Sequence, residues 1–489
     1  MKRVVVVGGG SAGLAAVRAL RFAQVELTLV DQRNHHVFKP LLPQLAAGLV
    51  SETAAAVSFR SLLRDQRNVR FGLAEAVYLV PEQNRLILAD RTLPYDFLIV
   101  ATGSQADLAP CPGVSDAEKS RLAPGLQSVV DAVGLRNQLL SVLETAAQEN
   151  EERQKELLRF LLVLEDTRRN PEAARRGIEH AAALVEMLRS CLATDFPEIS
   201  PGIPRILICA KTPHIETGLP NRSWRAVERE LRHAGIEFLT ERAVTQLTPA
   251  QAPRMQATKV TFEAMHDGVP VVETLRVGSV LWHAAPQPGD FLTAALHAAR
   301  IPADDEGWAV VQPDLSSGPF DNLFLTGSVV SADSFGRQAG REYMLAHHHS
   351  VAQGTHAAMA ILARLRGEPT KTFKPTRRNP FLWTGRHHAH GALHPALGSL
   401  RLHGWPGWLG WLNREVVSAG VSPLHLLGPV IQTAIGGLHR MVPPALLHLR
   451  PIPIGTSASP AALEPEPQGA PTRAKRTPTT RSRTRGAAQ

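Results

Sequence analysis

The sequence predicts an α/β protein with parallel sheets, and two series of elements point to it. Residues 4–7 form a short run of valines that favours a buried strand, and helix formers at 14–20 and a second strand at 25–30 follow it. A similar order returns later, where a strand at 160–164 and a helical stretch precede a strand at 205–209. Strands that alternate with helices are typical of parallel sheets.

The loop after the first strand has the pattern of a dinucleotide site. Residues 8–13 read GGGSAG, which matches GxGxxG between a strand and a helix. The glycines allow a tight turn, close approach of a pyrophosphate and close packing of helix on strand, while the helix N-terminus attracts phosphate. Asp31 ends the second strand, where an acid can accept a ribose hydroxyl. We therefore expect the following residues to bind a dinucleotide: Gly8, Gly10, Ser11, Ala12, Gly13 and Asp31. The alternative is a glycine-rich turn without a ligand.

Length, composition and cysteine spacing limit the kinds of protein that this chain could be. The chain has 489 residues, enough for two or three domains, and no run of eighteen apolar residues that would predict a membrane span. It begins directly with a strand, so we expect no signal peptide. Three cysteines at 111, 191 and 209 form no CxxC pair or metal pattern, which favours a reducing compartment.

The net charge of +9 is unevenly distributed. Residues 376–450 hold seven arginines and one acid, and residues 451–489 hold six basic and two acidic residues, so the remainder is close to neutral. Such a basic C-terminal region favours an acidic partner surface, either lipid or nucleic acid.

Residues 32–48 carry a resemblance to a known family. The segment has a Phe-x-Pro-Leu-Leu core at 38–42 and ends in Ala-Ala-Gly. It resembles the type II NADH dehydrogenases, single-subunit flavoproteins that pass electrons from NADH to membrane quinone. The resemblance implies two Rossmann-like domains of the glutathione-reductase type, with FAD as the cofactor. Sulfide:quinone oxidoreductases share the plan but match this segment less well, and the cysteines here match no sulfide-handling pattern.

Other segments extend the resemblance. Residues 95–104, YDFLIVATGS, form a strand that ends in small residues, where the chain passes close to a flavin. Residues 322–328, NLFLTGS, resemble a third FAD element, with Ser328 where the family usually has an aspartate; serine hydrogen-bonds without charge, which implies weaker binding. The further FAD residues that the resemblance implies are Gln32, Lys39, Pro40, Ala76, Ala101, Thr102, Gly103, Gly327 and Ser328.

The second dinucleotide loop departs from the family. After the strand at 160–164 the chain reads EDTRRNPEAARR, with no glycine before Gly177, and Ala210 stands where the next strand should end on an acid. Side chains in place of glycine would crowd a pyrophosphate, so the fold is expected to persist and the ordinary grip on NADH to be lost. Four arginines are open to two interpretations, phosphate binding by charge or a solvated loop, and a polar loop favours the second: Arg168, Arg169, Arg175 and Arg176.

Two further residues are implied by the resemblance. Glu179 matches a glutamate near the nicotinamide, and His348 stands where a quinone-contacting glutamine is expected. His348 belongs to a run of three histidines at 347–349, but neighbours on a helix point about 100° apart and cannot face one ion. We therefore expect no metal site.

The C-terminal region changes in composition. Four of the seven tryptophans lie at 383, 405, 408 and 411, and residues 425–441 form an apolar segment too short to span a bilayer. Amphipathic helices that lie on a membrane surface fit this composition, and helices packed on the body or on a second subunit are the alternative.

The predicted domains are an FAD-binding domain in two parts, 1–115 and 276–370, an inserted, degenerate NAD(H)-binding-like domain at 116–275, a C-terminal membrane-association region at 371–450 and a disordered basic tail at 451–489. The predicted function is transfer of electrons from NADH or another reductant through FAD to a membrane quinone, at the cytoplasmic face of the membrane. We expect no nucleic-acid partner, and a homodimer is possible. Two alternatives remain open: a flavoenzyme with a donor other than NADH, and a degenerate paralogue that acts as a binding or regulatory module.

Overall fold

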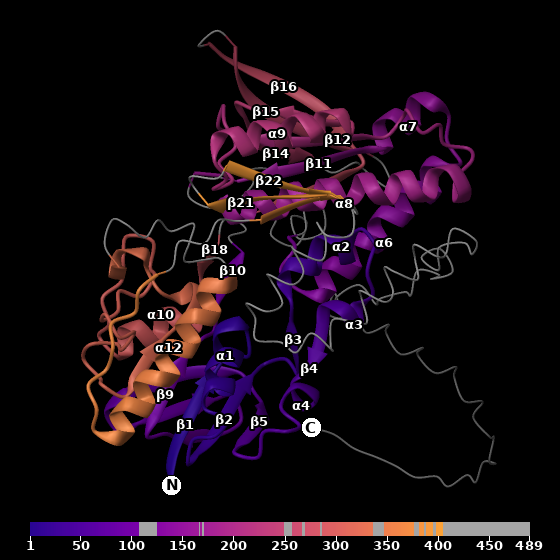
Figure 1. Cartoon of the computed structure of the whole chain (residues 1–489). Coiled ribbons are helices and arrows are strands. Elements are labelled where there is room, and N and C mark those ends of the chain that lie inside the picture. The colour runs from indigo at the N-terminus through magenta and orange to yellow at the C-terminus, as the bar shows by residue number, and fades with distance from the viewer. Residues whose placement is uncertain are drawn as a thin grey trace, which may run out of the picture. The chain divides into compact units, whose positions relative to one another are not determined.

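The computed structural model describes residues 1–106, 125–165, 167–168, 171–248, 257–266, 269–283, 286–335, 347–375, 381–385, 388–394 and 398–403. All of these lie in the first of two compact units, Met1–His448. Within it, two parallel sheets each carry helices (Figure 1).

The first sheet defines what we call the first Rossmann-like unit. Its strands run in the order β19-β9-β1-β2-β5 and all pair in parallel. Their bounds are β1 Lys2–Val7, β2 Val25–Asp31, β5 Val69–Leu73, β9 Phe97–Val100 and β19 Leu323–Leu325. The predicted strands at 4–7 and 25–30 therefore lie in one sheet with β19, which comes from the predicted FAD element at 322–328, although about 315 residues separate β1 from β19. Helix α1, Ser11–Ala19, packs closely against α12, His347–Arg366.

The second sheet defines the second Rossmann-like unit. Its strands run in the order β13-β12-β11-β17, again all parallel. Their bounds are β11 Arg159–Leu164, β12 Arg205–Ala210, β13 Ile236–Leu239 and β17 Ser279–His283, with helices α8 Pro171–Asp195 and α9 Asn221–His233. The predicted α/β fold with two such units is confirmed, and the predicted domain limits stay predictions.

Shorter elements connect the two units. An antiparallel pair, β10 Ser104–Ala106 and β18 Pro286–Pro288, joins the segments that leave β9 and β17. Helix α2, Leu42–Ala46, packs against α8 and against α6, Val129–Ala146, which begins with a capping box between Ser128 and Asp131. Phe38, Leu41 and Ile178 consequently belong to one buried core.

The remaining described elements are β3 His35–Val37, η1 Lys39–Leu41, α3 Glu52–Ala55, β4 Ala56–Ser58, α4 Phe59–Leu62, β6 Ala76–Val80, η2 Pro81–Gln83, β7 Arg85–Leu88, β8 Thr92–Pro94, α7 Glu151–Leu157, β14 Arg242–Thr248, β15 Thr258–His266, β16 Val269–Val277, α10 Asp290–Ala298, η3 Gly327–Val329 and η4 Ala332–Phe335. Strands β6-β7-β8 and β14-β15-β16 form two antiparallel sheets.

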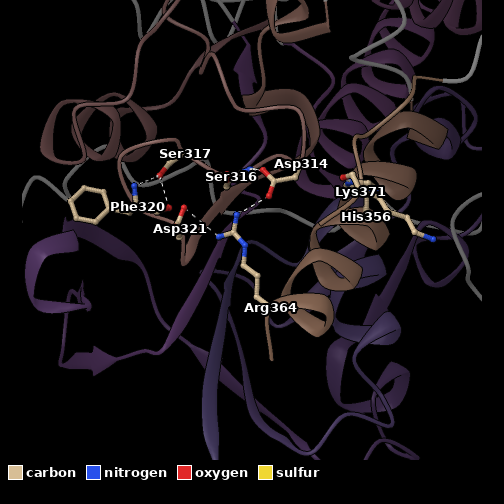
Figure 2. Close-up of polar contacts among 8 residues, drawn as sticks. All are labelled: Asp314, Ser316, Ser317, Phe320, Asp321, His356, Arg364 and Lys371. Atoms are coloured by element: carbon tan, nitrogen blue, oxygen red, sulfur yellow. Dashed lines mark hydrogen bonds and ion pairs between the residues drawn. The ribbon is translucent and has the colours of Figure 1, made fainter. Parts of the chain in front are cut away.

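A polar network holds α12 to the loop before β19 (Figure 2). Arg364 of α12 donates to the Asp314 carboxylate at 2.7 Å, and the other oxygen of Asp314 accepts from the backbone and hydroxyl of Ser316. Burial acts to raise the pKa of Asp314, but the bonds from Ser316 and the charge of Arg364 outweigh it and hold the pKa below its usual value. Further along α12, His356 bonds the backbone oxygen of Lys371.

The first part of the predicted membrane-association region is a sheet. Strands β20 Phe381–Gly385, β21 His388–His394 and β22 Gly398–His403 form an antiparallel sheet, and the predicted amphipathic helices lie further along the chain. This sheet packs on α8 and α9: Leu382 is fully buried, and the Thr384 hydroxyl donates to Glu230. The segments with Trp405, Trp408 and Trp411, residues 425–441 and the tail lie outside the described residues. No helix among the described residues is long and apolar enough to cross a membrane.

Candidate functional site: a dinucleotide cradle in the first unit

The glycine loop after β1 is shaped by close contacts at three of its four glycines. Gly8 has a φ of +95°, and a Cβ there would lie 2.3 Å from the Ala101 oxygen. A Cβ at Gly9 would lie 2.1 Å from the Phe59 ring, and one at Gly13 would lie 1.8 Å from the Gly8 oxygen. These positions need glycine because strand, ring or helix approaches them closely.

Gly10 is different, because a Cβ there would meet nothing within 4 Å among the described residues. Gly10 is also the N-cap of α1, with extended backbone and no side-chain cap. The open space at Gly10 therefore lies directly at the N-terminus of a helix, where backbone N–H groups and the helix dipole favour a phosphate. This geometry fits the pyrophosphate of a dinucleotide.

Two other predicted segments meet this loop. Beyond the end of β9, Ala101 lies against Gly8, and a Cβ at Gly103 would approach the Ser328 hydroxyl to 3.9 Å. A Cβ at Gly327 would approach the Ala12 side chain to 3.0 Å. The structure thus brings together eight predicted FAD residues from three separate segments: Gly8, Gly10, Ala12, Gly13, Ala101, Gly103, Gly327 and Ser328. Thr102 and Ser11 lie between them in the chain.

Asp31, the last residue of β2, faces the same loop. Its carboxylate accepts hydrogen bonds from the backbone of Gly9 at 2.7 Å and of Arg33 at 2.8 Å. An acid at this place fixes the loop, and its remaining lone pairs suit a ribose hydroxyl. Gln32 follows it in an exposed position.

The other predicted FAD residues are not joined to this cradle by any described contact. Pro40 lies in η1 and Ala76 in β6, each partly buried. Lys39 lies near the second unit, where its ammonium donates to Gln127 at 3.2 Å. Burial and the nearby charges of Arg176 and Arg33 lower the pKa of Lys39 to about 8.

Sequence reasoning missed three residues that support the cradle. His36 is buried and bonds the Gly9 oxygen through Nδ1 at 2.9 Å; burial lowers its pKa, opposed by this bond. Gln353 of α12 is fully buried, and its amide oxygen accepts from the Gly327 backbone at 2.7 Å. Gly354 is the contact point of α12 with α1, since a Cβ there would lie 1.9 Å from the Ala12 oxygen. Gly354 had a visible signal, a lone glycine inside a helical stretch.

The second unit has a different first turn. Helix α8 begins at Pro171, so part of the arginine-rich stretch predicted as a solvated loop is helical. Arg175 is 9% exposed and donates through Nη1 to the Thr217 backbone oxygen, which corrects the solvated-loop interpretation at this residue. Arg168 is exposed, and Arg169 lies outside the described residues.

Glu179 lies in α8, buried to 5% exposure, and no described contact joins it to the cradle. Its neighbour His180 is paired with His283 at the end of β17, with 3.4 Å between Nδ1 and Nε2. Burial lowers the pKa of His180 to about 3 and the pKa of His283 well below its usual value, so both rings are neutral at pH 7.

The histidine run lies at the start of α12. The side chain of His348 is outside what the structure describes, and His349 is fully buried. In the described part of the chain, no group of three His, Cys, Asp or Glu side chains is arranged to hold a metal ion.

The described residues thus form two Rossmann-like units, and one of them has an open dinucleotide cradle built from three segments. Residues 2–147 match the family described as pyridine nucleotide-disulphide oxidoreductase, which is FAD-dependent. The match bears out the predicted cofactor and enzyme class.

Two relatives are similar to the chain over most of its length. The chain is 28% identical over 426 residues to the type II NADH:quinone oxidoreductase NdhA of Mycobacterium tuberculosis, covering 85% of this chain and 83% of the relative. It is 26% identical over 424 residues to the type II NADH:quinone oxidoreductase Ndh of the same organism, covering 84% and 82%. The predicted resemblance to type II NADH dehydrogenases is confirmed over most of the chain.

Solved structures agree in fold. NDH2 from Plasmodium falciparum in complex with NADH superposes with a TM-score of 0.71 at 14% identity, covering 88% of this chain and 97% of the other. The sulfide:quinone oxidoreductase of Aquifex aeolicus superposes with a TM-score of 0.66 at 16% identity, covering 88% and 92%.

Proposed function

We propose that the chain is an FAD-dependent oxidoreductase that delivers electrons to a membrane quinone. The observation that carries the proposal is the open space at Gly10, which lies at a helix N-terminus where three segments meet. FAD, when bound, supplies the chemistry that accepts two electrons from a donor and passes them to a quinone. The relatives named above are NADH:quinone oxidoreductases, and this chain aligns with more than 80% of the length of each.

The residues of the first unit bind and orient the cofactor. The N-terminus of α1 receives the pyrophosphate, and Asp31 holds the ribose while it fixes Gly9. Gln353 fixes the backbone at Gly327, so that Ser328 faces the segment at Gly103. The neutral Ser328 hydroxyl would offer FAD a hydrogen bond without charge.

Helix α12 links cofactor and acceptor in this proposal. It carries His348 in its first turn and Gln353 in its second, and Arg364 fixes its far end on Asp314. A histidine at position 348 can donate a hydrogen bond to a quinone oxygen or transfer a proton to it. The basic C-terminal region would hold the protein peripherally on the cytoplasmic face of the membrane, where such a quinone is available.

The described cysteines disfavour a sulfide-oxidising alternative, which uses reactive thiols. Cys191 and Cys209 are buried, and burial raises the pKa of both thiols to about 12. A thiol with so high a pKa remains protonated and is a poor nucleophile at neutral pH.

The test uses the full-length protein loaded with FAD, reduced anaerobically with dithionite and then mixed with a short-chain quinone. We expect the quinone to restore the oxidised flavin spectrum, and the His348→Ala variant to do so more slowly than the His297→Ala control on α10. A reduced flavin that the quinone does not reoxidise would contradict the proposal and favour a scaffold without catalysis.

A further inference from the structure

The two Rossmann-like units can be compared at the glycine where the helix of each unit packs on its sheet. In the first unit this contact is at Gly13, the third residue of α1. In the second unit it is at Gly177, where a Cβ would lie 2.2 Å from the Leu164 side chain, and Gly177 is the seventh residue of α8. Helix α8 therefore begins four residues earlier, which is about 6 Å at 1.5 Å per residue.

The added turn occupies the place where a shorter helix would receive a pyrophosphate. In a dinucleotide-binding unit the pyrophosphate lies at the helix N-terminus, beside the last glycine of the fingerprint. Here the added turn is packed rather than open: Pro171, Ala173 and Ala174 are buried. Gly177 itself is as closely packed as Gly13, since a Cβ there would meet both Leu164 and His283.

The loops on the two sides of the expected site are bonded to one another. Arg175 donates to the Thr217 backbone oxygen in the loop after β12. Thr167, in the loop after β11, accepts at Oγ1 from the Glu216 backbone at 3.3 Å and lies 3.2 Å from the Thr212 hydroxyl. These bonds lie at the carboxyl ends of β11 and β12, the edge of the sheet at which dinucleotides bind in folds of this kind.

The ribose position has changed as well. In the first unit β2 ends on Asp31, which bonds its glycine loop. In the second unit β12 ends on Ala210, whose methyl group is buried and can accept no hydrogen bond. The pyrophosphate site and the ribose site are thus altered independently.

The added turn also lies near η1, one of the short elements between the two units. The charges of Arg176 and Glu172 both act on Lys39 in η1, so the three side chains lie near one another. Glu172 has one carboxylate oxygen that is buried without a hydrogen-bond partner among the described residues. Burial raises the pKa of this carboxyl, against the charges of Arg176 and Arg175.

We propose that helix α8 closes the second Rossmann-like unit with its own first turn, so that this unit does not bind NAD(P)H and the electrons come from another donor. The statement about the electron donor rests on the proposed FAD-dependent function. The closure of the second unit by α8 does not depend on that function. The second unit then has a structural role beside the first unit, and the residues that select the electron donor lie outside the second unit.

The decisive experiment is an anaerobic titration of the full-length, FAD-loaded protein with NADH and NADPH up to about 1 mM, the top of the ordinary range of KM values. We expect no bleaching of the flavin, while dithionite bleaches it fully. Bleaching by NADH that saturates below this concentration would overturn the proposal. Because reoxidation by quinone after dithionite needs no NADH, failure of the proposed function would be seen separately.

A second experiment tests whether NADH binding can be restored by replacing the first turn of α8. Residues 165–176 are replaced by Gly-Gly-Gly-Ser-Ala, the sequence of residues 8–12, so that the fingerprint is complete at Gly177. We expect binding of NADH to strengthen at least about tenfold relative to the wild type, measured by calorimetry. Equal and measurable binding by both proteins would count against closure by α8.

Hydrogen exchange on the wild-type protein tests the same point without the loop-replacement variant, so the result does not depend on whether that variant folds. We expect the amides of 173–176 and 212–217 to be protected, with no change when NADH is added. Arg175→Ala should speed exchange in 212–217, whereas Arg189→Ala, an exposed arginine of the same helix, should not. NADH-dependent protection of either segment would show that the site is open.

Discussion

Gly354→Ala tests the contact on which the cradle depends. The added Cβ would lie 1.9 Å from the Ala12 backbone oxygen, whereas ordinary contact begins near 3.4 Å, so α12 and α1 would have to move apart by about 1.5 Å. Overpacking of this kind costs about 1–3 kcal/mol, and alanine returns up to about 1 kcal/mol of helix propensity. The shift also strains the bond between Gln353 and Gly327, worth about 1 kcal/mol. We expect a net loss of about 2 kcal/mol.

The matched control is Gly134→Ala in α6. Gly134 is exposed, and a Cβ there meets nothing within 4 Å among the described residues, so this variant should gain up to about 1 kcal/mol. The assay is the temperature at which FAD is released, followed by flavin fluorescence, together with the urea midpoint. Gly354→Ala should release FAD several degrees earlier than the wild type. If Gly354→Ala were as stable as Gly134→Ala, the packing of α12 on α1 described here would be wrong.

Three further predictions follow from the same contacts. Gly10→Ala should lower the stability of the FAD-free protein by no more than about 1 kcal/mol, because glycine is the better N-cap, but it should weaken FAD binding at least about tenfold, because its Cβ fills the space for pyrophosphate. Unchanged FAD affinity by fluorescence titration would place the cofactor elsewhere. Arg364→Ala should cost about 2 kcal/mol in urea unfolding, because it leaves the mostly buried Asp314 carboxylate without its cation, and Arg366→Ala on the exposed side should cost far less. The buried His180 has a folded-state pKa below its unfolded value, so stability should be complete above about pH 6.5 and fall as the pH drops toward 3, by up to about 1.4 kcal/mol per pH unit. His180→Leu should flatten that slope in thermal unfolding; an unchanged slope would show that His180 does not contribute to it.

The first unit could be predicted from the sequence because the residues that identify it lie close together in the chain. The valine run, the glycines at 8–13 and Asp31 follow one another within one strand–helix–strand segment, and their spacing already requires close backbone contacts. Gln353 and His36 could not be predicted in the same way. Each bonds a backbone atom of a distant or buried loop, and no sequence spacing shows which glutamine or histidine will reach it.

The second unit shows where a sequence pattern misled the prediction. The stretch 165–176 is rich in charge, which favours a loop, yet α8 begins inside it. A local signal was present in Asn170-Pro171-Glu172, since a cap residue, proline at the first position and an acid in the first turn are typical of a helix start. The burial of Arg175 follows from its bond to Thr217, a tertiary contact that composition cannot reveal.

The strands at 381–403 have a similar explanation. The tryptophans at 405–411 and the apolar segment at 425–441 favoured surface helices, but they gave no sign of the antiparallel sheet that precedes them and packs on α8 and α9. The strand pairing depends on contacts with helices about 200 residues earlier in the chain. Helix formation further on, around Trp408, stays a prediction.

The most direct test of the account is the absorbance spectrum of the purified full-length protein. We predict the two bands of oxidised flavin, at about one FAD per chain after incubation with the cofactor, because three segments form a cradle around an open space at Gly10. A colourless protein that takes up no FAD under these conditions would contradict the account, and the first unit would then be a fold that has lost its cofactor.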